Sequence, residues 1–407
     1  MPVPEAGFGG PIGPSVRRIL LIMPTLRGIT WDHVRGVAPL IATTEEFRKR
    51  RPSFHIEWDK RSLKDFEDYP IDVLAEKYDL IMLDHPCIGT AVRKKVLLPL
   101  DDWIPKEYLA EQKRNSVGPS YDTYTWEGRQ WALAVDTAAQ VSAYRPDLVE
   151  RVGQSIPGTW DDVFALAAAL DGTGMKIGIP LNPTHAFISF MTLGAHLKGE
   201  GFWTEEDGVD GGASEEALGL LKRLLPHVHG MSLDSDPIRM LDRMGETDEL
   251  VYVPLIYGYV NYSIEGFRKN LVRFADIPVL RGEPSGSVIG GVGLAISARC
   301  RAVPEAVEYA MYVASGDCQK GLYFESGGQP GHREAWLDEH VNRISHGFFR
   351  NTLKTLDLTY VRPRYPGYLN IQEKAGEIVR EFLLGTENGR ETIRKINELY
   401  RESKEEV

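Results

Sequence analysis

Apolar and polar positions along the first third of the chain alternate between strand-like and helix-like periods. Residues 17–24 and 78–86 are continuous apolar runs, which are typical of strands buried on both faces. Residues 53–58 alternate apolar with polar positions, which indicates a less buried strand. Helical patterns separate these strands, and the one over 63–77 is expected to break near Pro70. This order predicts a parallel sheet with right-handed crossovers.

The middle of the chain has a different organisation. Two long strand patterns, 130–145 and 286–297, enclose a second series of strands and helices. The simplest architecture is two α/β lobes that are joined by chain crossings and separated by a cleft. From Pro304 onward the pattern is helical, with interruptions at 326–333 and 361–368. Within the second series we expect helices near 159–170 (capped by Thr159), 185–198 and 214–227, strands at 176–182 and 272–279, and a strand followed by a loop over 249–263.

Length and composition limit the possible classes of protein. A chain of 407 residues exceeds what one compact core usually supports, so two domains are expected. The 47 basic and 58 acidic residues give a net charge of −11, which argues against nucleic acid as a partner. No apolar run approaches the roughly 18 residues of a membrane span, and no secretion signal is recognisable. The chain is therefore expected to be cytoplasmic as given, or periplasmic or extracellular if a signal has been removed.

Two polar loops are expected at the same edge of the first lobe. "GITWDHVRG" (28–36) and "DHPCIG" (84–89) each follow a predicted strand, and ligands in such sheets bind beyond the carboxyl ends of strands. Trp31 is a candidate for stacking on a sugar ring, or else a buried wedge at the strand end. Arg35 is expected to be solvated or salt-bridged. Polar candidates in and beside these loops are Arg27, Thr30, Asp32, His33, Asp84, His85 and Cys87, although Asp32 is equally suited to cap the following helix.

The order of elements and several segments resemble the extracellular solute-binding proteins of ABC importers. The similarity is to the carbohydrate-type family that includes maltose-binding protein. This resemblance implies a type II periplasmic-binding-protein-like α/β fold, with two lobes that close on a ligand by hinge motion, and delivery to a permease rather than chemistry. The segments that carry it are "YDLIMLDHP", "LLPLDDWIP", "YTWEGRQWALAVDTAAQVSAYRPDLV", "GTWDDVFALA", "GGVGLAIS", "PEAVEYAMYVASGDCQKGLYFESGGQP" and "RPRYPGY".

The expected division of the chain follows the two long strands. We expect a first lobe of residues 1–135 with 292–330, a second lobe of residues 136–291, and a C-terminal helical segment, 331–407, packed on the lobes. The expected partners are a small polar solute, most simply a sugar or sugar derivative, and an ABC permease. No nucleic acid, cofactor or metal is expected, and the protein is expected to be a monomer.

Further ligand candidates lie on the later strands and loops. The resemblance places Asp136 and Gln140 at the ligand, on the first crossing strand. Tyr257, Tyr259 and Asn261 follow an apolar strand, so their side chains are candidates to face the cleft together, or to pack between strand and helix. Gly290 and Gly291 permit close backbone approach. The remaining candidates are Gln329 and His332 in one loop, and Arg362, Arg364 and Tyr365 in a proline-rich segment, where the guanidiniums bind either a ligand carboxylate or phosphate or the protein's own carboxylates.

Two other functions remain as alternatives. The first is an enzyme on the same scaffold, similar to thiaminases, with Cys87 as a nucleophile activated by His85 or His33. The second is a cytoplasmic ligand sensor. The "HVH" of residues 227–229 does not suit a metal, because side chains two positions apart diverge on a helix.

Overall fold

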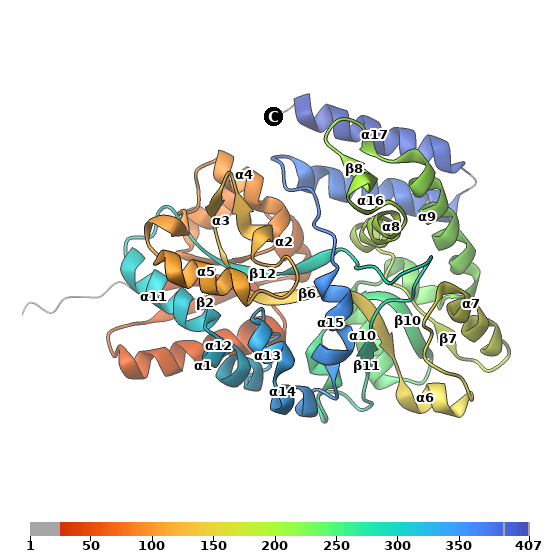
Figure 1. Ribbon diagram of the computed structural model, residues 1–407, viewed down its shortest axis with the longest axis horizontal. Helices are drawn as coiled ribbons and strands as arrows, with labels where there is room; N and C mark the ends of the chain where they lie inside the picture. The colour runs from red at the N-terminus through yellow and green to blue at the C-terminus, as the bar shows by residue number, and fades with distance from the viewer. Residues whose placement is uncertain (1–24, 386, 406–407) are drawn as a thin grey trace, which may run out of the picture.

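One mixed sheet passes through both halves of the molecule. The computed structural model describes residues 25–385 and 387–405, within which an eight-stranded sheet has the order β2-β1-β3-β12-β6-β10-β7, with β11 paired to β6. Two α/β lobes lie side by side, and β6 and β12 run between them (Figure 1). The strands are β1 (Leu26–Trp31), β2 (Ile56–Arg61), β3 (Leu80–Leu83), β6 (Leu133–Tyr144), β7 (Lys176–Ile177), β10 (Leu250–Tyr257), β11 (Arg273–Ala275) and β12 (Ile289–Ile296).

The first lobe is built on parallel strands, as the sequence predicted. β1 pairs in parallel with β2 and β3, and β12 returns antiparallel to β3. All four residues of the apolar β3 are buried, as expected for a strand that is covered on both faces. Separate core clusters on the two faces contain α1 and α11 in one case and α3 and α4 in the other. The helices are α1 (Val34–Arg50), α2 (Leu63–Asp68), α3 (Ile71–Lys77), α4 (Ile88–Arg93), α5 (Lys106–Arg114) and α11 (Val303–Ala314).

The prediction of a tight loop over 28–36 is wrong. Gly28 and Trp31 belong to β1, and α1 begins at Val34, so only Asp32 and His33 connect the two elements. Gly28 permits a close side-chain contact within the sheet, because a Cβ atom there would lie 2.4 Å from the Trp58 ring. The strand predicted at 17–24 lies outside the described residues. The predicted break near Pro70 is confirmed by the boundary between α2 and α3.

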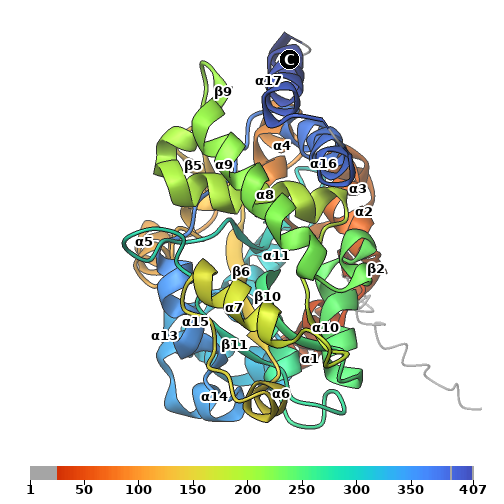
Figure 2. The ribbon, with the colours of Figure 1, turned by 90° about the vertical axis from the view of Figure 1, so that its right-hand side faces the viewer.

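The second lobe shares β6 with the first. One end of β6 pairs with β12, and the other pairs antiparallel with β10 and β11. Thr159 caps α7 in a capping box with Asp162, which confirms the predicted helix start. Helices α8, α9, α16 and α17 pack together on this lobe (Figure 2). The helices here are α6 (Pro146–Arg151), α7 (Trp160–Ala169), α8 (Pro183–Lys198), α9 (Gly211–Leu224), α10 (Pro237–Glu246), α15 (Phe348–Asp357), α16 (Tyr368–Leu384) and α17 (Gly389–Glu405).

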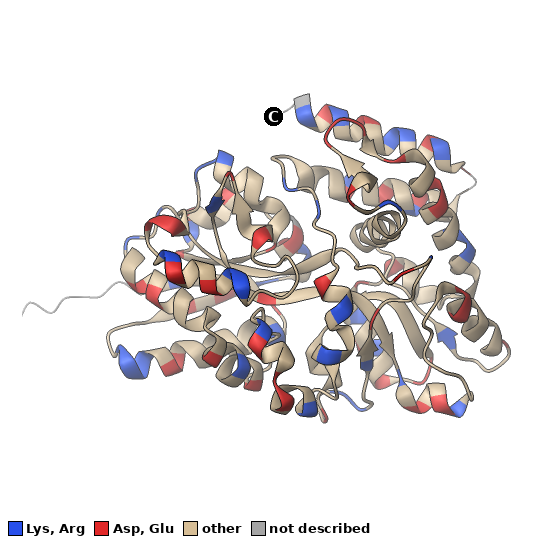
Figure 3. Ribbon diagram, in the orientation of Figure 1, with Lys and Arg blue, Asp and Glu red and all other residues tan. Residues whose placement is uncertain are grey.

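Short elements complete the architecture. Strand pairs β4–β5 and β8–β9 form two small hairpins outside the main sheet. Acidic and basic residues are interspersed along the ribbon of both lobes (Figure 3). Within the described residues, no helix is long and apolar enough to cross a membrane. The remaining bounds are β4 (Thr125–Trp126), β5 (Arg129–Gln130), β8 (Trp203–Thr204), β9 (Gly208–Val209), α12 (Gly316–Cys318), α13 (Arg333–Leu337) and α14 (Glu339–Ile344).

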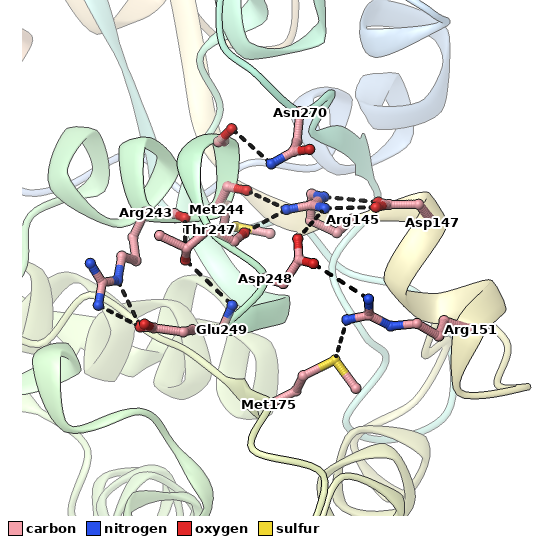
Figure 4. Close-up of polar contacts among 11 residues, drawn as sticks. Arg145, Asp147, Arg151, Met175, Arg243, Met244, Thr247, Asp248, Glu249 and Asn270 are labelled. Atoms are coloured by element: carbon pink, nitrogen blue, oxygen red, sulfur yellow. Dashed lines mark hydrogen bonds and ion pairs between the residues drawn. The ribbon is translucent and has the colours of Figure 1, made fainter.

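A buried arginine fixes the end of β6 in the second lobe. Arg145 is only 1% exposed and donates to both carboxylate oxygens of Asp147, at 2.8 and 2.6 Å. It also donates to the carbonyls of Met244 and Thr247, at 2.8 and 2.6 Å, and to Asp248 at 2.9 Å (Figure 4). Because a buried charge is costly unless it is paired and hydrogen-bonded, this set of acceptors ties the end of β6 to the end of α10.

Gly291 lies on β12 opposite Thr137 of β6, in the strand pair that runs between the lobes. Its φ is +117°, and a Cβ atom there would lie 2.5 Å from the carbonyl oxygen of Asp136. We predict that Gly291→Ala lowers the free energy of unfolding by about 1–3 kcal/mol or more, because it adds a steric clash to an unfavourable φ. Chemical denaturation measures the change.

Gly219 provides the matched control for that substitution. It lies inside α9, and a Cβ atom there would meet nothing within 4 Å. Gly219→Ala is expected to stabilise the protein by up to about 1 kcal/mol, because alanine is the better helix former. Equal effects of the two substitutions would contradict the proposed role of Gly291.

Candidate functional site

A cavity of about 60 Å³ lies between the two lobes. We call it the central cavity. Trp31 at the end of β1 and Asp84 after β3 contribute from the first lobe, and Tyr257 at the end of β10 and His185 in the first turn of α8 contribute from the second. Its walls therefore meet at the carboxyl ends of strands, where α/β sheets bind ligands. The lining residues are Trp31, Arg35, Leu63, Phe66, Glu67, Asp84, Ala138, His185, Pro237, Tyr257, Tyr259, Gly290, Gly291 and Val292.

Six of the residues proposed from the sequence meet in this cavity. They come from four separate segments of the chain. The positions of Tyr257 and Gly290 are explained by the packing of the tyrosine ring against the glycine. A Cβ atom on Gly290 would lie 2.7 Å from Cε1 of Tyr257, so the glycine allows that ring to lie against β12. The six residues are Trp31, Asp84, Tyr257, Tyr259, Gly290 and Gly291.

Trp31 forms one wall of the central cavity. The side chain is 2% exposed, and its ring lies 5.3 Å from that of Phe66 in a tilted arrangement. A Cβ atom on Gly36 would lie 2.5 Å from the indole, so only a glycine at this position allows the ring to pack against α1. The Nε1 atom is buried and has no hydrogen-bond acceptor among the described residues. The indole thus combines a packed face with an unsatisfied donor beside the cavity.

A buried ion pair connects α1 with β6 beside the cavity. Arg35 is 3% exposed and donates from Nε and Nη2 to the two carboxylate oxygens of Asp136, at 2.7 and 2.5 Å. Its Nη1 donates to the Gly258 carbonyl at 2.8 Å, and its guanidinium lies 4.6 Å from the ring centroid of Tyr259. From the sequence, Arg35 was expected to be either solvated or salt-bridged. The structure shows that it is salt-bridged, to Asp136.

Asp84 stands between the cavity and a second buried arginine. Its carboxylate accepts from Nη2 of Arg362 at 2.7 Å, and Arg362 donates from Nη1 to Gln372 at 2.8 Å. Nδ1 of His85 lies 3.0 Å from Asp84 Oδ1. Although burial alone would raise it, the positive charge of Arg362 holds the pKa of Asp84 below its ordinary value. Asp84 is therefore an ionised carboxylate whose charge is already compensated within the protein.

Other candidates from the first lobe lie away from the central cavity. Arg27 is exposed and pairs with Asp59 at 2.8 Å, while exposed Asp32 pairs with Lys60 at 2.8 Å. Thr30 is buried and donates to the carbonyl of Gly36. His33, rather than Asp32, caps α1 by accepting from the Arg35 amide, and its ring contacts that of Tyr259 at 4.9 Å.

Several candidates from the later segments hold the backbone around the site. Each makes hydrogen bonds to protein groups that explain its position. Gln140 bonds Ser189 and Thr192, Asn261 donates to the Gly327 carbonyl, Gln329 joins the Val260 amide to the Thr137 carbonyl, His332 lies 3.0 Å from Glu111, Arg364 donates to the carbonyls of Asp122, Thr123 and Thr125, and Tyr365 bonds Ser403.

Cys87 lies on a separate space, which we call the outer cavity. This cavity has a volume of about 450 Å³ and lies between α3–α4 and the start of α16. The thiol donates to the Asp84 carbonyl at 3.1 Å, and burial raises its pKa to about 12. Cys87 is therefore a protonated thiol at neutral pH, and a thiol is a poor nucleophile.

The sequence reasoning missed most of the α2 side of the site. Leu63, Phe66 and Glu67 lie on one face of this helix, with the spacing i, i+3, i+4. The sequence shows this spacing, but the spacing alone does not distinguish a helix face that packs into the core from one that lines a cleft. His185 was missed because it follows an ordinary helix cap at Asn182. Among the residues described, no group of three or more His, Cys, Asp or Glu side chains is arranged to hold a metal ion.

Comparison with known proteins identifies the class of this chain. The profile of the bacterial extracellular solute-binding protein family matches residues 32–234, about half of the chain. The chain belongs to this family. Its fold matches that of two-lobe solute-binding proteins across nearly its whole length.

Three solved structures illustrate the likeness. A solute-binding protein of an ABC transporter from Thermotoga lettingae, bound with α-D-tagatose, has a TM-score of 0.79 at 18% identity and covers 94% of this chain and 100% of its own. Maltose-bound MalE3 of T. maritima gives the same values. A protein from Agrobacterium radiobacter in complex with ribitol has a TM-score of 0.73 at 19% identity, and covers 94% of this chain and 98% of its own. At these identities the likeness describes the fold.

The Arg35–Asp136 pair is expected to be important for stability. We predict that Asp136→Asn lowers the free energy of unfolding by about 3–5 kcal/mol, because it leaves a buried guanidinium without its counter-charge. The exposed pair of Asp32 with Lys60 is the matched control, and Asp32→Asn is expected to change stability by less than about 1 kcal/mol. Denaturant titration of both variants measures the difference, and similar losses would contradict the assignment.

Three histidines with lowered pKa values make stability dependent on pH. Burial lowers the pKa of His33 and of His85 to about 4, and that of His185 to about 3. Between pH 6.5 and 4 the unfolded chain binds protons on these rings that the folded chain does not, so stability falls as the pH falls. We predict a lower melting temperature at pH 4.5 than at pH 7.5, and a smaller loss for His185→Gln. An unchanged loss in that variant would contradict the prediction for His185.

Proposed function

We propose that this protein binds a sugar, polyol or sugar derivative between its lobes and delivers it to an ABC permease. The observation that carries this proposal is the central cavity itself, which lies between the lobes and is walled by Trp31, Tyr257 and Tyr259. Aromatic rings bind the apolar faces of sugars, while polar groups around them bind hydroxyls. The solved relatives that carry tagatose, maltose and ribitol support the same class of ligand.

Binding requires the two lobes to separate and close again. The central cavity of about 60 Å³ is smaller than the roughly 300–1,000 Å³ of typical ligand sites. Hinge motion about the strands that connect the lobes would admit a ligand. The lobes proposed to move are residues 1–135 with 292–330 and residues 136–291, and the contact of Arg35 with the Gly258 carbonyl is one that would break on opening.

The remaining parts of the proposal concern where the protein acts. Membership of an extracellular solute-binding family favours a periplasmic or extracellular site of action. A monomer that meets its permease through the outer surfaces of both lobes would let the permease sense whether the cleft is closed.

The contacts of Cys87 support binding rather than chemistry. Its thiol is hydrogen-bonded to the Asp84 carbonyl, and its raised pKa keeps it protonated at neutral pH. A nucleophilic cysteine requires a nearby base or cation that stabilises the thiolate. We therefore propose that the protein is not an enzyme.

Thermal denaturation with a panel of ligands tests the proposal. We expect D-tagatose, maltose, ribitol or a related sugar to raise the melting temperature by several degrees, because a ligand at a hundredfold excess over its Kd adds about 2.7 kcal/mol. Calorimetry then gives the Kd of any hit. Tyr257→Ala should weaken binding by about tenfold or more, because an aromatic wall is lost.

Tyr78→Ala is the matched control for this experiment. Tyr78 lies before β3 and contacts Arg27 and Asp59, away from the central cavity, so its removal should leave the Kd unchanged. No thermal shift with any sugar or polyol would contradict the proposal. Conversion of a bound ligand to a product, lost in Cys87→Ser, would show an enzyme instead.

A further inference from the structure

The arginines near the central cavity already carry partners from the protein itself. Arg35 bonds both oxygens of Asp136. Arg362 is 3% exposed and bonds Asp84, whose carboxylate lines the cavity while Arg362 does not. The negative group therefore covers the positive one from the side on which a ligand would lie.

A third guanidinium near the cleft, that of Arg61, has only uncharged acceptors, and its Nε has no hydrogen-bond partner among the described residues. Arg61 donates to the carbonyls of Asp65 and Met82, at 3.2 and 3.0 Å, and lies 5.2 Å from the ring centroid of Phe66. It faces a separate space of about 10 Å³ and not the central cavity. Phe66, Glu67 and Asp84 line both spaces.

The position of Arg362 is fixed relative to Asp84. Two residues further along the chain, the carbonyl of Arg364 accepts from the Gly89 amide at 3.0 Å. The Arg364 side chain also donates to three carbonyls in the segment 122–125 of the first lobe. These contacts connect the segment that carries Arg362 to the lobe that carries Asp84, while the bond from Arg362 to Gln372 connects it to α16 on the second lobe.

The mouth of the cleft is acidic. A space of about 150 Å³ adjoins the central cavity and shares Leu63 and Glu67 with it. The charged residues that line this space are Lys64, Glu67, Asp236, Glu373 and Glu377. Asp236, Glu373 and Glu377 outnumber the single ammonium of Lys64, which gives this mouth a negative potential that disfavours anions.

The donor inside the cavity suits an uncharged ligand. The buried Trp31 Nε1 has no acceptor among the described residues, and a hydroxyl oxygen would satisfy it. His185 lines the same cavity, and burial lowers its pKa to about 3, so it adds no positive charge at neutral pH.

We propose that the cleft selects uncharged polyhydroxylated ligands and excludes sugar acids and sugar phosphates, with Asp84 as the specificity-determining residue. This inference rests on the proposed function. A carboxylate or phosphate in the cavity would lie against Asp84, while the guanidiniums of Arg35 and Arg362 are bonded to Asp136 and Asp84. Burying an anion without a free counter-charge is costly, and in the ion pair of Asp84 with Arg362 it is the carboxylate, and not the guanidinium, that lines the cavity and would face the anion.

Matched pairs of ligands test the inference by calorimetry at pH 7.5. The probes are D-glucose with D-glucuronate and D-glucose 6-phosphate, D-galactose with D-galacturonate, and ribitol with D-ribonate. We expect the neutral member of any pair that binds to do so at least about tenfold more tightly. An anionic member that binds as well or better would overturn the inference while leaving the proposed function standing. No binding by any sugar or polyol would overturn both.

Asp84→Asn tests the specificity role directly. The substitution keeps the shape of the side chain and uncovers the charge of Arg362. We expect the preference for the neutral member to fall by about tenfold or more, because Arg362 becomes available to an anion. An unchanged preference would overturn the role of Asp84. The control is Asp248→Asn, which removes one carboxylate from the buried Arg145 in the second lobe (Figure 4) and should leave the preference unchanged.

A surface variant covers the case in which Asp84→Asn does not fold. Glu373 and Glu377 are exposed on α16, so the double change to glutamine is expected to preserve the fold. It should reduce the preference for neutral ligands, and the reduction should shrink at high salt because screening weakens the same repulsion. No change at low salt would overturn the role of the acidic mouth.

Discussion

The ion pair of Arg35 with Asp136 is the contact on which the arrangement of the site depends. It joins the first helix to the strand that both lobes share, and the same guanidinium reaches the carbonyl of Gly258 in the second lobe. A charge pair buried to this degree is stable only with near-complete hydrogen bonding, which constrains the three segments at once. The walls of the central cavity, Trp31 before α1 and Tyr257 and Tyr259 around Gly258, lie on those segments. The pair therefore positions the aromatic groups without being available to a ligand itself.

The same principle extends to the rest of the cleft. Asp84 with Arg362, like Arg35 with Asp136, satisfies a buried cation internally. A cleft built in this way presents hydrogen-bonding groups without a net demand for counter-charge. That property suits neutral solutes, and closure of the lobes around them does not bury an unpaired ion. Arg145 in the second lobe follows the same rule for a structural purpose, since it has no part in the cavity.

Much of the fold could be predicted from the sequence, because hydrophobic periodicity and helix caps are local signals. The break at Pro70, the Thr159 cap and the long strand over 133–144 all follow from neighbouring residues. The failure at 28–36 has an equally local cause. Gly28 was placed at the start of the predicted loop, whereas it lies in β1 and makes room for Trp58, which lies thirty residues further along the chain. A glycine with a packing role has the same appearance in a sequence as a glycine with a turn role.

The sequence by itself determined the class of fold and the idea that polar loops of two lobes share a cleft. It also placed Trp31, Asp84, Tyr257 and Tyr259 among the candidates, because each lies in a polar or aromatic segment that follows an apolar strand pattern. Only the tertiary structure decided which polar side chains face that cleft and which form ion pairs or hydrogen bonds with other groups of the protein. Asp136 and Arg362 were both proposed as ligand groups, and both lie in ion pairs with residues about 100 or more positions away. The physical reason is that pairing of buried charges is set by three-dimensional proximity, which composition and spacing along the chain do not encode.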